Sequence, residues 1–152
     1  MERPSPESHD LACQLLAHEM QGPSLEGRTP TETAEAGQRI CQKLYQQMAQ
    51  LIGPTGFNAL GARALHLARI EFPFLNGVEI RMQEEGCLKG LPESVQGQPP
   101  AEISSALVAV FANFIWLLVT FIGKDLALRQ LRSIWPEISP CGADADAKEE
   151  KG

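Results

Sequence analysis

The sequence has few basic residues. Lys and Arg together number 13 and Asp and Glu number 19 among 152 residues, which gives a formal net charge of −6. Attraction to nucleic acid depends on clustered Lys and Arg, which displace counterions from phosphates. The charge balance therefore argues against nucleic acid as a partner and predicts a protein with an acidic surface.

Cysteine is sparse, and no two cysteines are close in sequence. The four are Cys13, Cys41, Cys87 and Cys141. None forms the C-x-x-C pair of zinc and thioredoxin-like sites, so we expect reduced, structural thiols. His9 and Cys13 have the four-residue spacing that can place two ligands on one helical face, but tetrahedral zinc needs two more. We therefore predict no metal site.

Local catalytic signatures are missing as well. The chain has no glycine-rich phosphate loop, no G-x-S-x-G elbow and no H-E-x-x-H motif. Glu71, next to Phe72 and Pro73, is the one carboxylate in an apolar neighbourhood. We expect a non-enzymatic protein without a cofactor. An enzyme whose site is assembled from distant residues is the alternative, which a pocket containing His66 or Glu71 would favour.

Both ends of the chain are polar. The first ten residues, MERPSPESHD, lack the basic stretch and apolar core of a secretory signal, so we expect a cytoplasmic location, with the membrane as the alternative. A chain of this length that is 43% hydrophobic fits one domain with one core. We predict a flexible tail at 1–8, a single helical domain at 9–136 and a flexible acidic tail at 137–152.

Three segments with helical periodicity precede the middle of the chain. Ser8, Thr29 and Thr55 offer N-cap hydroxyls for them. The second segment has the strongest start signal, TPTE, and its apolar residues recur every three or four positions until Gly53 and Pro54 end it. Residues 78–83 then alternate apolar and polar side chains, which predicts the first strand of a short β-hairpin.

The most apolar stretch is ISSALVAVFANFIWLLVTFIG, residues 103–123, which has no charged side chain. About 20 apolar residues suffice to cross a bilayer, so a membrane span is one interpretation. The other is a buried central helix, because the helices predicted at 31–52 and 56–72 each display an apolar stripe that must be covered. We favour the central helix. One face of the 103–123 segment also supports this interpretation. That face has smaller or more polar side chains at Ser105, Ala109, Ala112, Trp116, Thr120 and Gly123.

The expected fold is therefore mainly α. It is a bundle of about four helices around one long apolar C-terminal helix, with a short β-hairpin. A break at Gly123 would divide that long helix into two.

The available working surfaces of such a bundle are its helix faces. We expect a small protein-interaction or regulatory module whose partner contact uses Ala109, Asn113 and Trp116, since Trp is a frequent interface anchor. Self-association fits the same surface. The alternative is a single-pass or membrane-associated protein that uses residues 103–123.

A second candidate contact is a cationic row on the third predicted helix. Arg63, His66 and Arg69 recur at three-residue spacing, and Arg can bind phosphate or carboxylate with two hydrogen bonds. The row is predicted as an anion contact, with a solvated helix face as the alternative.

Overall fold

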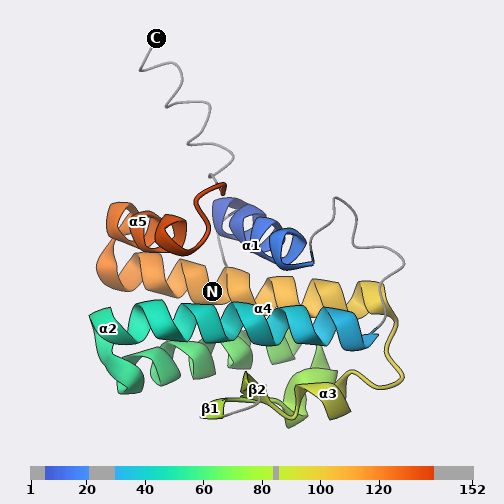
Figure 1. Ribbon diagram of the computed structural model, residues 1–152. Coiled ribbons are helices and arrows are strands. Elements are labelled where there is room, and N and C mark those ends of the chain that lie inside the picture. The colour runs from blue at the N-terminus through green and yellow to red at the C-terminus, as the bar shows by residue number, and fades with distance from the viewer. Residues whose placement is uncertain (1–5, 21–29, 84–85, 139–152) are drawn as a thin grey trace.

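The structure is a computed structural model that describes residues 6–20, 30–83 and 86–138 (Figure 1). Its elements in chain order are α1 (Pro6–Glu19), α2 (Pro30–Glu71), the 3-10 helix η1 (Pro73–Gly77), β1 (Glu79–Gln83), β2 (Gly86–Lys89), α3 (Leu91–Ser94), α4 (Pro100–Ile122) and α5 (Lys124–Ile134). The predicted mainly α fold with a β-hairpin is confirmed. The tails predicted at 1–8 and 137–152 fall largely outside the described residues.

α2 is two helices joined by a sharp break. Gly53 has φ 83° and ψ 158°, a non-helical conformation that glycine adopts without steric cost, and Pro54 follows it. The sequence predicted this boundary correctly. Figure 1 shows the two arms of α2 running in opposite directions, so both can pack against α4.

α4 is the central helix of the molecule. Buried side chains occupy most of its length, among them Ile103, Leu107, Phe111, Ile115 and Leu118. The Phe114 ring lies 5.3 Å from the Phe57 ring of α2. Within the described residues, α4 is also long and apolar enough to cross a membrane, although 56% of its most apolar window is buried inside the protein.

The hairpin is short and lies against α2. β1 and β2 are antiparallel, with Ile80 opposite Leu88 and an irregular register beyond it. The Gln38 side chain of α2 donates to the Leu88 carbonyl oxygen at 2.7 Å and accepts from the Leu88 N–H at 2.9 Å. Two isolated strands are marginally stable in water, so this support from a helix accounts for their persistence.

The chain turns back after α4. Gly123, with φ 96°, ends α4 and precedes α5, as the sequence predicted for a break at this glycine. Ala127 and Leu131 of α5 are buried, and Trp135 immediately after it is fully buried. In Figure 1, α5 lies beside the last turns of α4, on the same side of it as α1.

Candidate functional site

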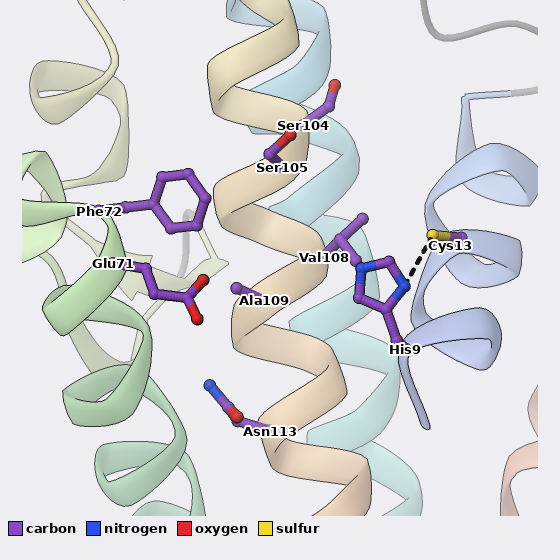
Figure 2. Close-up of a pocket in the computed structure, with 9 residues that line it drawn as sticks. All are labelled: His9, Cys13, Glu71, Phe72, Ser104, Ser105, Val108, Ala109 and Asn113. Atoms are coloured by element: carbon purple, nitrogen blue, oxygen red, sulfur yellow. Dashed lines mark hydrogen bonds between the residues drawn. The ribbon is translucent and has the colours of Figure 1, made fainter. Parts of the chain in front are cut away.

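A groove of about 320 Å³ lies over α4, between α1 and the end of α2 (Figure 2). We call it the α4 groove. Its lining residues are His9, Cys13, Glu71, Phe72, Ser104, Ser105, Val108, Ala109 and Asn113. Three helices that are far apart in sequence therefore form one concave surface.

The floor of the groove is a row of small side chains. Ser105, Ala109 and Asn113 follow one another at four-residue spacing, which keeps them on one face of α4. Asn113 is 5% exposed, and its Nδ2 donates to the Ala64 carbonyl oxygen of α2 at 3.3 Å. The floor is thus held in place by a neighbouring helix.

Each wall comes from a different helix. Figure 2 shows His9 and Cys13 of α1 on one side of α4, and Glu71 and Phe72 on the other. α2 ends here because Pro73 cannot continue its hydrogen-bonding pattern. The Phe72 ring packs edge-on against the Phe74 ring, with centroids 6.3 Å apart.

Ser104 is the least satisfied polar group of the groove. It is 5% exposed, and its Oγ has no hydrogen-bond partner among the residues that the structure describes. A buried hydroxyl without a partner costs about 1–3 kcal/mol, because it loses its bonds to water. A ligand that offered a donor or acceptor there would recover part of this cost.

The cysteine and histidine of the groove do not form a reactive pair. Cys13 Sγ lies 3.9 Å from His9 Nδ1. Burial, and then the nearby charge of Asp10, raise the pKa of the Cys13 thiol above its ordinary value. The thiol therefore stays protonated at neutral pH, and the thiolate is the nucleophilic form.

No metal centre accompanies the pair. Across residues 6–20, 30–83 and 86–138, no group of three His, Cys, Asp or Glu side chains could hold a metal ion. Glu71 does line the groove, whereas His66 is an exposed residue of α2 and is not among the lining residues.

The predicted partner contacts lie on one side of α4. Ala109 is partly exposed, and both Ala109 and Asn113 belong to the groove floor. Trp116 is also partly exposed, seven residues after Ala109 and hence near the same face. It lies beyond the lined part of the groove, and its carbonyl oxygen accepts from Thr120 Oγ1 at 2.9 Å.

The predicted cationic row is divided. The Arg69 guanidinium donates to two backbone carbonyl oxygens, that of Leu75 at 3.3 Å and that of Val78 at 2.5 Å. Arg69 therefore holds η1 against the end of α2. Arg63 and His66 are exposed on α2, and an anion contact at these two positions stays a prediction.

One expectation about the cysteines is wrong. Cys41 is buried and takes part in a disulfide, whereas we expected reduced thiols throughout. A disulfide requires closeness in space, which widely spaced cysteines in a sequence do not reveal. Cys13 is free, and the side chains of Cys87 and Cys141 lie outside the described part of the chain.

A second site was not foreseen from sequence. Glu19, at the end of α1, is 6% exposed and binds three groups, Lys43, Arg39 and Trp135. We call these four residues the Glu19 cluster. In the sequence, the only indication of this cluster was a single carboxylate after the apolar residues Leu15 and Leu16.

No family model, curated protein or solved structure matches the chain at a significant level. The function must therefore be argued from the groove itself, since a fold alone does not specify one.

Proposed function

We propose that this protein is a small, non-enzymatic protein-interaction module that binds a helix of a partner protein in the α4 groove. The observation that carries the proposal is the floor of small side chains, Ser105, Ala109 and Asn113, along one face of an apolar helix. Amphipathic helices bind in grooves of this kind through residues at three- and four-residue spacing.

The dimensions of α4 suit a helical partner. From Ser105 to Thr120 the helix rises about 22 Å, which is the length of a helix of about four turns. Helix axes lie about 8–10 Å apart depending on the side chains between them, and small residues such as Ala109 permit the closer approach. A partner helix could therefore lie along α4 between the walls.

Trp116 would anchor the far end of such a partner. Its side chain is partly exposed. Tryptophan has a large contact area and recurs among the residues that contribute most to protein interfaces. Ile70, which is 70% exposed and directly precedes Glu71, would add an apolar contact at the rim.

Site-specific photocrosslinking in the cells that naturally produce the protein tests this function. A photoreactive amino acid at Ala109 should yield a discrete crosslinked protein, whereas the same group at Ala62, exposed on α2, should not. Equal products at both positions, or none at Ala109, would contradict the proposal. A product with twice the mass of the chain would identify self-association.

A matched pair of variants gives the complementary test. Ala109→Arg places a long charged side chain on the groove floor, and it should remove the crosslink formed from a photoreactive group at Ser105. Ala62→Arg adds the same charge on an exposed α2 position and should leave that crosslink intact. Circular dichroism of both variants confirms that the helices are retained.

Membrane association is the second candidate, because α4 meets the length and hydropathy of a span. Phe121, near its end, is 65% exposed. Flotation with liposomes separates the two functions: a groove-binding soluble module stays at the bottom of the gradient, whereas a membrane protein rises with the vesicles and needs detergent for release.

A cytoplasmic location is part of the proposal, and the Cys41 disulfide bears on it directly. Disulfides are rare in reducing compartments. Rapid acid quenching of cells followed by thiol alkylation should find Cys41 reduced if the protein resides in the cytoplasm. An oxidised Cys41 would place it in an oxidising compartment instead.

A further inference from the structure

We infer that the partner helix carries a Lys or Arg side chain that contacts Glu71 midway along the α4 groove. This inference rests on the proposed function, because it names the chemistry of the segment that the groove binds. Charge complementarity is the argument for it, and an unpartnered buried hydroxyl lines the same groove.

Glu71 is the only Asp, Glu, Lys or Arg among the nine lining residues. It is exposed, and within the described residues its carboxylate has no ion-pair or hydrogen-bond partner. In Figure 2 its carboxylate extends from α2 toward α4, level with Ala109. A partner that lies on the floor would meet this negative charge.

The cationic residue nearest in sequence does not pair with the Glu71 carboxylate. Arg69 lies two residues before Glu71, but its guanidinium is engaged by the carbonyl oxygens of Leu75 and Val78. Arg can make several hydrogen bonds at once, and here they hold backbone in place. The carboxylate of Glu71 therefore remains available to a cation from outside the chain.

A second carboxylate lies beyond the Ser105 end of the floor. Glu102 is exposed in the first turn of α4, three residues before Ser105 and seven before Ala109, which places it on the face that forms the floor. Two negative charges along this face favour cationic side chains in the partner and disfavour acidic ones.

Ser104 supplies the independent observation. Its Oγ is buried without a partner and belongs to the lining of the same groove. Among the described residues this hydroxyl is unsatisfied and the Glu71 carboxylate is unpaired. Figure 2 shows Ser104 on the side of α4 that faces α1, across the helix from Glu71, so it marks a second polar position of the groove.

Selection from a display library tests the inference with a defined probe. The library consists of 18-residue helical peptides with an Ala, Ser and Leu face and one fully randomised position per turn, selected on the full-length protein. We expect Lys and Arg to be enriched at one randomised position by about threefold over the starting library, as an exposed ion pair allows.

Variants assign the preference to Glu71. Glu71→Gln should abolish the enrichment of basic residues, and Glu71→Lys should replace it with enrichment of Asp and Glu. Glu35→Gln is the matched control, since Glu35 is exposed on the first arm of α2, and it should leave the preference unchanged. Ala109→Arg should eliminate the selected peptides altogether.

Three results would overturn the inference. They are peptides selected without a basic preference, a basic preference that survives Glu71→Gln, and no selected peptide at all. Formation of the photocrosslink at Ala109 does not depend on a charged residue in the partner. A crosslink that persists while the selection fails would remove the basic contact and leave the proposed function in place.

Discussion

The indole Nε1 of Trp135 donates a 2.9 Å hydrogen bond to Oε2 of Glu19, which lies 116 residues earlier in the chain. Lys43 pairs with the same carboxylate oxygen, and Arg39 Nε contacts the other at 3.2 Å. The Glu19 cluster thereby joins the end of α1, the first arm of α2 and the segment after α5. It fixes α1, which carries one wall of the groove.

Glu19→Gln should destabilise the protein by about 2 kcal/mol or more, because it leaves two cations and an indole N–H beside a neutral group. Lys43 and Arg39 are roughly half exposed, so water can solvate their charges and limit the loss. Urea unfolding followed by circular dichroism measures the difference. Glu35→Gln should change the free energy of unfolding by less than about 0.5 kcal/mol.

Acid should lower the unfolding free energy of the wild-type protein by protonating the Glu19 carboxylate. Burial alone would raise the pKa of Glu19, but hydrogen bonds from Lys43, Trp135 and Arg39 outweigh it and lower the pKa below its ordinary value of 4.5. Its stabilising contribution is therefore complete above pH 4.5 and is lost as the pH falls through the lowered pKa. Between pH 5 and 3 the unfolding free energy should fall more steeply in wild type than in Glu19→Gln. Parallel curves would contradict this assignment.

Two glycines with similar backbone angles should respond differently to alanine. Gly90 and Gly97 have φ of 86° and 83°, but a Cβ at Gly90 would lie 2.3 Å from the Gly77 carbonyl oxygen, whereas a Cβ at Gly97 has nothing within 4 Å. Gly97→Ala should cost about 1 kcal/mol from backbone strain alone. Gly90→Ala should cost about 3 kcal/mol or more, because backbone must move. Urea unfolding of both variants provides the comparison. Equal losses in the free energy of unfolding would show that the close approach to the Gly77 carbonyl oxygen does not affect stability.

The described cysteines should differ in reactivity. Cys13 is free with a raised pKa, so iodoacetamide at pH 7 should label it slowly compared with an unfolded control. In protein purified without reductant, Cys41 should be disulfide-bonded and buried as in the structure, so it should be labelled only after reduction and unfolding. Mass spectrometry of the two proteolytic peptides distinguishes them. Rapid labelling of Cys41 without reductant would contradict the disulfide.

The helix boundaries at the two glycines could be predicted because their signals are local, whereas α1 begins at Pro6, before the predicted cap Ser8. Gly53 and Gly123 interrupt apolar periodicity, and each adopts a backbone conformation that disfavours other residues. The central position of α4 could also be predicted, since its apolar length had to be covered by the stripes of the other helices. Such inferences need no knowledge of which residues meet in space.

The groove and the Glu19 cluster could be predicted only in part. Ala109 and Asn113 are recognisable as a small, polar interruption of an apolar helix. The walls of the groove are not recognisable in the sequence, because His9 and Glu71 reach the groove only through the packing of α1 and α2 on α4. The partners of Glu19 are similarly distant in sequence, and no periodic pattern relates them.

The position of α4 after both arms of α2 imposes an order on folding. Ribosomes release the polypeptide from its N-terminus, so both arms of α2 emerge before the helix that covers their apolar stripes. These stripes stay open to solvent or to chaperones until α4 has left the ribosome, and nascent chains in that state are prone to aggregate. Translation speed over the codons for α4 should therefore affect the yield of native protein.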